Sequence, residues 1–77
     1  MERDFDPTEV SSAIIQGLSG IGDSEERSLQ FGSQLWDVVI QEDPSWSDVL
    51  EVIDVAEKDG KINPDFVSRG YLAAALA

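Results

Sequence analysis

Cysteine and histidine are both absent from this chain of 77 residues. Without cysteine, the chain can form no disulfide and can carry out no thiolate chemistry. Without histidine, it lacks the commonest general base and the commonest metal ligand, and it cannot assemble a Ser/His/Asp nucleophile. We therefore predict a non-enzymatic protein that holds no metal ion and no cofactor.

Basic residues are scarce as well. Five Lys and Arg residues stand against 16 Asp and Glu residues, which gives a net charge of −11. The five are scattered along the sequence: Arg3, Arg27, Lys58, Lys61 and Arg69. A field this negative repels nucleic acid and anionic membranes, and it attracts basic protein surfaces. We therefore expect no direct contact with nucleic acid or membrane, and a larger protein with a basic surface as the partner.

Long hydrophobic runs are missing too. No stretch approaches the roughly 20 apolar residues of a membrane span. The first four residues, Met1 to Asp4, include two acids and precede no apolar run of the kind found in a signal peptide. The hydrophobic content of 42% is nevertheless enough for one modest core. The sequence predicts a single cytoplasmic domain that spans residues 1–77.

Capping residues and glycines mark the ends of the helices. A cap side chain accepts a free backbone N–H of the first turn, and proline is favoured at the first helical position. Three cap and proline pairs indicate helix starts: Asp6-Pro7, Asp43-Pro44 and Asn63-Pro64. Asp23 indicates a fourth start, and glycines at 20, 22 and 60 indicate helix ends. We predict a compact all-α four-helix bundle, with helices at about 7–19, 24–41, 44–58 and 64–76.

Helical periodicity predicts which side of each helix is buried. In the first helix the buried set is Val10, Ala13, Ile14 and Leu18. In the third helix it is Trp46, Val49, Leu50, Val52, Ile53 and Ala56. Trp36 and Trp46 each lie near the centre of an apolar arc, so we predict that both tryptophans are largely buried.

Acidic residues concentrate in the third predicted helix. Asp48, Glu51, Asp54 and Glu57 recur every three residues on the side opposite its apolar face, and Val55 lies among them. Carboxylates at this spacing project a line of charge that resembles a row of phosphates, and an apolar residue within a charged ring is a common interface pattern. We predict that these five residues form the partner-binding surface. The alternative is a solvated face that only confers solubility.

The segment 54–66 resembles the EF-hand family in its core of Asp59, Gly60 and Ile62. With Gly60 at the sixth loop position, Val55 and Phe66 occupy the first and last positions, where a calcium loop needs oxygen ligands. A glycine-capped helix end followed by a new helix start explains every residue of this segment. We therefore predict no calcium site.

Ser24 follows Asp23 at the start of the second predicted helix. In its small size, its acidity and this pair of residues, the chain resembles the acyl carrier protein family. That family attaches phosphopantetheine to a serine that opens its second helix. Glu25 stands where that family's Asp-Ser-Leu motif has leucine. The resemblance implies an alternative function, a carrier or adaptor domain of a larger assembly with Ser24 as the attachment residue.

Leu72 and Leu76 share a side of the last predicted helix, away from Phe66 and Tyr71. One turn of apolar surface is too small for a tight obligate interface, so we expect a monomer or a weak homodimer. A small structural subunit that self-associates through this strip is a further alternative.

The preferred function is an acidic protein-interaction module. In size and charge the chain is similar to small mobile-element inhibitors, including phage-encoded anti-restriction and anti-CRISPR proteins and nucleic-acid mimics. This resemblance implies that the chain docks on a basic surface of a larger protein.

Overall fold

The computed structural model describes residues 5–60 and 62–77 of the chain. It contains four α-helices in these residues: α1 (Pro7–Gly17), α2 (Ser24–Glu42), α3 (Trp46–Lys58) and α4 (Pro64–Leu76). No strand occurs in the same residues. The Cα radius of gyration is 11.6 Å, close to the value of about 11.5 Å expected for a compact chain of this length. The predicted all-α four-helix fold is confirmed.

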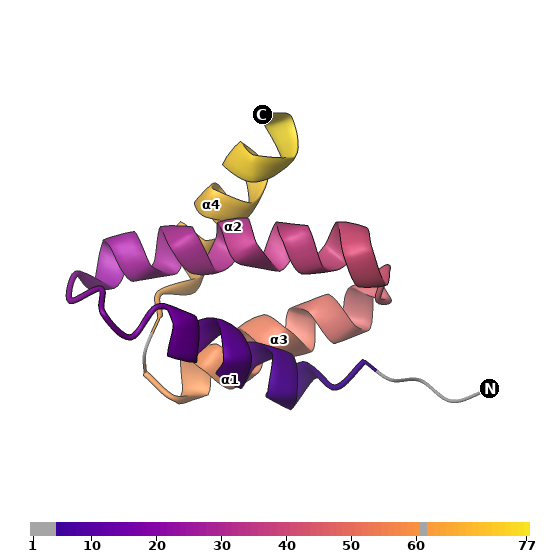
Figure 1. Cartoon of the computed structure of the whole chain (residues 1–77), viewed down its shortest axis with the longest axis horizontal. Helices are drawn as coiled ribbons and strands as arrows, with labels where there is room; N and C mark the ends of the chain where they lie inside the picture. The colour runs from indigo at the N-terminus through magenta and orange to yellow at the C-terminus, as the bar shows by residue number, and fades with distance from the viewer. Residues whose placement is uncertain (1–4, 61) are drawn as a thin grey trace.

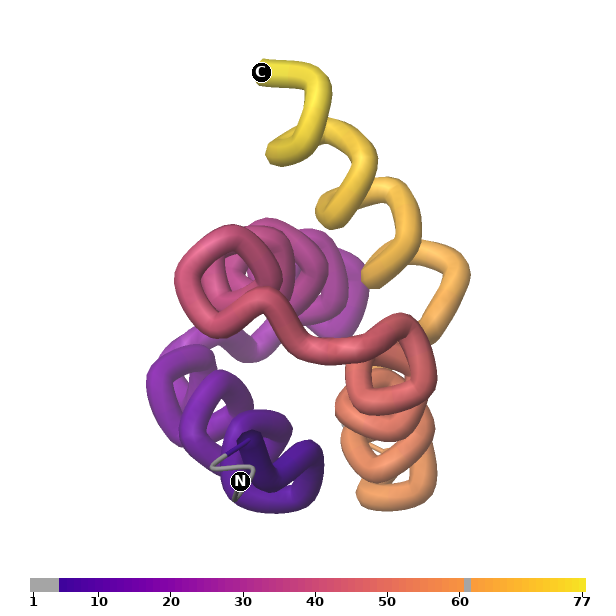
Figure 2. Tube along the Cα trace, turned by 90° about the vertical axis from the view of Figure 1, so that its right-hand side faces the viewer, coloured from indigo at the N-terminus to yellow at the C-terminus, as the bar shows by residue number. Residues whose placement is uncertain are grey.

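The helices associate as two close pairs. The most extensive contacts are between α2 and α4 and between α1 and α3. In Figure 1, α2 spans the molecule, α1 and α3 run along one side of it, and α4 crosses it. Figure 2 shows that α4 leans away from the other three helices, so that the C-terminus projects beyond them. The second half of α4 is therefore covered on only part of its circumference.

Three of the four predicted helix starts are confirmed. The side chain of Asp6 accepts the N–H of Thr8 at 3.1 Å. Asp23 and Asn63 act in the same way at the starts of α2 and α4. Each of these side chains satisfies a backbone donor that has no partner inside its helix.

The predicted start of α3 at Asp43-Pro44 is wrong. Asp43 instead ends α2, in the left-handed conformation with φ 51°, and its N–H donates to the carbonyl of Val39. Aspartate tolerates this conformation better than most residues do. Ser45 then caps α3, since its hydroxyl accepts the N–H of Asp48 at 3.3 Å. The end of α1 also differs from the prediction, because the helix stops at Gly17 rather than at residue 19.

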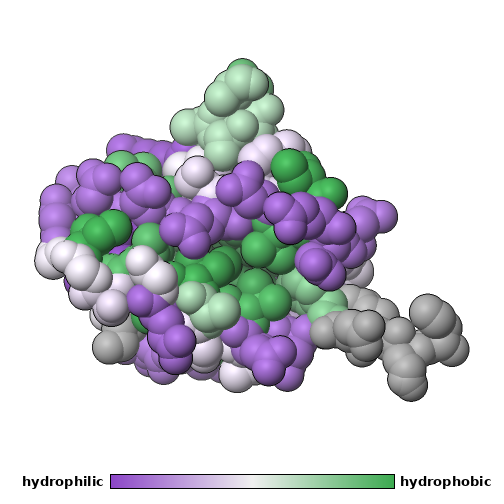
Figure 3. Space-filling view, in the orientation of Figure 1, coloured by the Kyte–Doolittle hydropathy of each residue, from purple (hydrophilic) through white to green (hydrophobic). Residues whose placement is uncertain are grey.

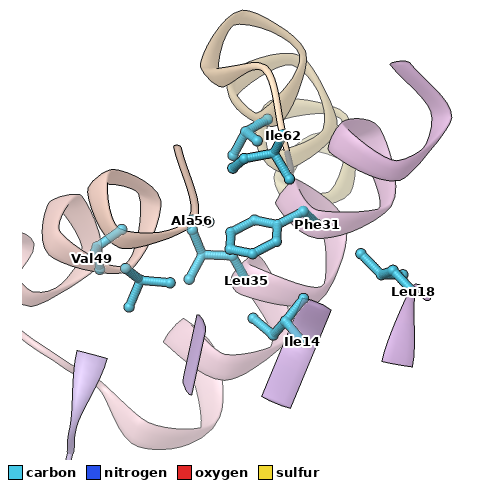
Figure 4. Close-up of a cluster of buried hydrophobic side chains, with 9 residues drawn as sticks. Ile14, Leu18, Phe31, Leu35, Val49, Ala56 and Ile62 are labelled. Atoms are coloured by element: carbon cyan, nitrogen blue, oxygen red, sulfur yellow. The ribbon is translucent and has the colours of Figure 1, made fainter. Parts of the chain in front are cut away.

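The core is built around α2. Figure 4 shows Phe31 and Leu35 at its centre, with Val49 on one side and Leu18 on the other. The full set of buried apolar residues is Ile14, Leu18, Phe31, Leu35, Val49, Val52, Ala56, Ile62 and Val67.

Several predicted core positions are not buried. Trp46 and Leu50 are 63% and 49% exposed, and Ala13 is exposed as well. Trp36 is only half-buried. Its ring packs edge-to-face against the ring of Tyr71, with 5.4 Å between the ring centroids. The predicted burial of both tryptophans is therefore wrong for Trp46. The helix α3 has a full apolar face, but α4 leans away from it (Figure 2), and Trp46 and Leu50 on one edge of that face stay exposed.

Two glycines allow α2 and α4 to cross in close contact. A Cβ atom at Gly32 would lie 2.6 Å from the backbone nitrogen of Tyr71 and would overlap the carbonyl oxygen of Val67. A Cβ atom at Gly70 would lie 2.9 Å from the Cα atom of Leu29 and would overlap its carbonyl oxygen. Neither clash can be relieved by turning a side chain, so the crossing requires glycine at both positions.

We predict that Gly32→Ala and Gly70→Ala each lower the free energy of unfolding by about 1–3 kcal/mol or more, because the helices must separate to admit the methyl group. Gly17→Ala is the matched control, since a Cβ atom there meets nothing within 4 Å. The control should leave stability unchanged or raise it by up to about 1 kcal/mol. Urea unfolding measures all three. Equal effects at the three positions would contradict the close crossing.

Two buried serines differ in their hydrogen bonding. The hydroxyl of Ser28 donates to the carbonyl of Ser24 at 2.8 Å and accepts the N–H of Asn63 at 2.7 Å. It therefore ties the start of α4 to α2. Ser11 is also fully buried, but its hydroxyl has no hydrogen-bond partner within residues 5–60 and 62–77.

Alanine at these two serines should have opposite effects. Ser28→Ala removes the acceptor of the Asn63 N–H, and we expect it to lower the free energy of unfolding by about 1–3 kcal/mol. Ser11→Ala removes an unsatisfied hydroxyl and adds helix propensity, and we expect a gain of about 1 kcal/mol. Thermal unfolding compares the two variants. A loss of stability in Ser11→Ala would show that its hydroxyl is satisfied.

Candidate interaction surfaces

The predicted partner-binding residues lie on α3, and three of them are exposed. Glu51, Asp54 and Glu57 face solvent. Asp54 pairs with Lys58 one turn later, with 3.2 Å between Oδ2 and Nζ. Both side chains of this pair are more than half exposed, so the pair contributes little to stability. It does reduce the negative charge at the middle of the row.

The other two predicted residues, Asp48 and Val55, are half-buried. They are seven residues apart and share one side of α3, whereas Glu57 lies on the side of Leu50 and Ile53. The reason is geometric. A step of three residues falls about 60° short of a full helical turn, so three such steps carry the row about halfway around the helix. The four acids therefore wind around α3 and do not form one straight face.

An apolar groove lies between α3 and α4. Its volume is about 230 Å³. Its lining residues are Trp46, Val49, Leu50 and Ile53 from α3, with Ser68, Tyr71 and Leu72 from α4. Val49 is buried and belongs to the core, so the floor of the groove is continuous with the hydrophobic interior.

The walls of this groove hold three large exposed apolar side chains. The exposed fractions are 63% for Trp46, 49% for Leu50 and 57% for Leu72. Sequence reasoning missed the groove because it assigned Trp46 and Leu50 to the core. The available signal was the strip formed by Leu72 and Leu76, which indicated that one side of the last helix is uncovered; Leu76 is 86% exposed.

A second hollow, of about 290 Å³, follows the seam between α1 and α2. Figure 3 shows hydrophobic surface along this seam, edged by hydrophilic side chains. Its apolar lining comes from Phe5, Val10, Ala13, Ile14 and Val38, and its polar lining from Asp6, Glu9, Gln41 and Glu42. Its large apolar side chains are buried or half-buried. The seam therefore presents less uncovered apolar surface than the groove does.

Ser24, the alternative attachment residue, is the first residue of α2 and is exposed. Its carbonyl accepts the hydroxyl of Ser28, and Asp23 caps the helix immediately before it. The capping signal at Asp23 predicted that Ser24 opens the second helix, and the structure confirms this position. The attachment itself stays a prediction.

Two further kinds of site are not found in the described part of the chain. No group of three or more acidic side chains in it is arranged to hold a metal ion. None of its helices combines the length and hydropathy that crossing a membrane would require. Comparison of the whole chain with protein-family models, curated proteins and solved structures gives no match.

The two tryptophans should respond differently to a soluble quencher. We predict that acrylamide quenches Trp46 freely, because its side chain is mostly exposed, and quenches Trp36 less, because its ring packs against Tyr71. Single-tryptophan variants, Trp36→Phe and Trp46→Phe, separate the two signals. Equal quenching in the two folded variants would show that Trp46 is covered in solution.

Proposed function

We propose that this chain is a non-enzymatic, acidic protein-interaction module that docks on a basic surface of a larger protein. The observation that carries the proposal is the coexistence on α3 of exposed carboxylates and exposed bulky apolar residues. Glu51 and Asp54 are exposed, and Trp46 and Leu50 are exposed on an adjoining side of the same helix. A surface of this kind combines electrostatic attraction with apolar area that a partner can cover.

The net charge of −11 supports the choice of a basic partner. Charge of one sign accelerates association with an oppositely charged surface and disfavours anionic partners. Basic surfaces that bind nucleic acid meet this requirement, so an inhibitor that occupies a nucleic-acid site is one form of the proposed function. The proposal includes a cytoplasmic location, with which the absence of disulfide-forming cysteine is compatible.

The charge proposal is tested by reversing two exposed acids on α3. Glu51→Lys with Asp54→Lys should leave the fold intact, since both side chains are exposed and such changes usually alter stability by less than about 0.5 kcal/mol. The matched control is Glu26→Lys with Asp37→Lys, which reverses two exposed acids on α2 and changes the net charge equally. All three proteins serve as baits in a nuclease-treated native lysate.

We expect at least one basic protein to bind the wild type and the control more strongly than the α3 variant. Its association with the wild type should be about tenfold faster than with the α3 variant, and the rate should fall as salt screens the charges. If the two double variants lose binding equally, only the net charge matters and α3 is no specific surface. If neither variant loses binding, the proposal is wrong.

A further inference from the structure

We propose that the groove between α3 and α4 receives a basic amphipathic helix of the partner protein. This inference rests on the proposed function, because both require a cationic partner. It goes further by naming the site, the secondary structure of the bound segment and its pattern of side chains.

The shape of the groove fits a helix. Trp46, Leu50 and Ile53 are spaced by four and three residues, so they form one ridge along about two turns of α3. Tyr71 and Leu72 form the facing wall on α4. Two helices that diverge along an apolar seam leave room for a third helix, which packs its own ridge between them. Helix-in-groove recognition uses anchors at this same spacing.

The lining of the groove is mostly apolar and therefore favours an occupant with apolar side chains. Of the seven lining residues, only Trp46, Ser68 and Tyr71 carry a polar side-chain atom. Three of the lining residues, Trp46, Leu50 and Leu72, are large, apolar and exposed, and they lie around a floor that is continuous with the core. Leucine-like residues at helical spacing on the occupant would cover them.

The charges around the groove favour an occupant helix whose outer face is cationic. Glu57 lies on the groove side of α3, and Asp65 lies one turn before Ser68 on α4; both are exposed. Of the cations among the described residues of α3 and α4, Lys58 pairs with Asp54 and Arg69 lies over the ring of Phe66 at 5.1 Å. Lysine or arginine beside the apolar anchors would therefore meet carboxylates.

The same charges disfavour the other occupants of such a groove. A second copy of this chain would bring together two molecules that each carry a net charge of −11. An anionic membrane surface would be repelled for the same reason. A basic amphipathic helix satisfies both the apolar lining and the acidic surroundings.

The test uses the full chain and a fluorescently labelled synthetic helix of leucine and lysine, with leucines on one face. Two control peptides separate the contributions. One has the same composition in an order that disperses the leucines, and the other replaces lysine by glutamate. Fluorescence anisotropy measures the affinity of each. We expect the amphipathic cationic peptide to bind about tenfold more tightly than either control.

Protein variants then locate the binding site. Leu50→Gln with Leu72→Gln removes apolar surface from both walls without changing the charge, and should weaken peptide binding about tenfold. Ile40→Gln is the matched control, because Ile40 is 60% exposed and does not line the groove. It should change the affinity less than about twofold. Circular dichroism checks that each variant is folded.

The outcomes separate this inference from the proposed function. Suppose that Leu50→Gln with Leu72→Gln leaves binding of the basic partner unchanged, while Glu51→Lys with Asp54→Lys weakens it. The groove is then not the binding site, and the proposed acidic interaction module stands. If neither change affects binding of that partner, both proposals fail. Equal affinity for the dispersed peptide overturns the helical occupant. A dimer in sedimentation that Leu72→Gln abolishes identifies a second copy as the occupant and also overturns the inference.

Discussion

The contact between the backbones of α2 and α4 is the constraint on which the rest of this structure depends. Gly32 and Gly70 bring the two helices together without intervening side chains, and backbone atoms of Leu29 and Val67 occupy the space. Because the contact lies at these two residues, it fixes where α4 crosses α2. The crossing directs the second half of α4 away from the core. The groove beside α3 is a result of that direction.

Polar contacts complement this crossing. The hydroxyl of Ser28 accepts the N–H of Asn63, the residue that caps α4. Arg27, next to Ser28 in α2, binds the loop that precedes this helix: its Nη2 atom donates to the carbonyl of Ile21 at 2.9 Å. One turn of α2 therefore holds both the loop that precedes it and the start of α4. In a domain with a small core, such contacts constrain the loops as well as adding stability.

The sequence predicted the number and the approximate limits of the helices because capping is a local effect. Asp6, Asp23 and Asn63 act on donors two or three residues away, so their role can be read without the fold. The same local reasoning erred at Asp43, where two capping signals lie close together. Aspartate can end a helix in the left-handed conformation as well as begin one. In this chain Asp43 ends α2, and Ser45 begins α3.

Burial was harder to predict, because it depends on which helices become neighbours. Trp46 and Leu50 carry the pattern of core residues, and no local feature of α3 indicates that α4 leaves them uncovered. The cause lies at Gly32 and Gly70, and their role is visible only once α2 and α4 are known to cross at these residues. The winding of the acids around α3, by contrast, follows from helical geometry alone and could have been derived from their spacing.

The position of Gly70 also divides α4 into two parts that should differ in local stability. Residues up to Tyr71 are joined to α2 by the backbone contact at the two glycines and by the ring of Trp36, and Val67 is fully buried. Beyond it, residues 75–77 are all exposed and carry no charged side chain. Helical hydrogen bonds with so little tertiary support open without global unfolding. The amide hydrogens of these last residues should therefore exchange with solvent much faster than those near Val67, so that the end of the chain frays and re-forms while the crossing stays closed.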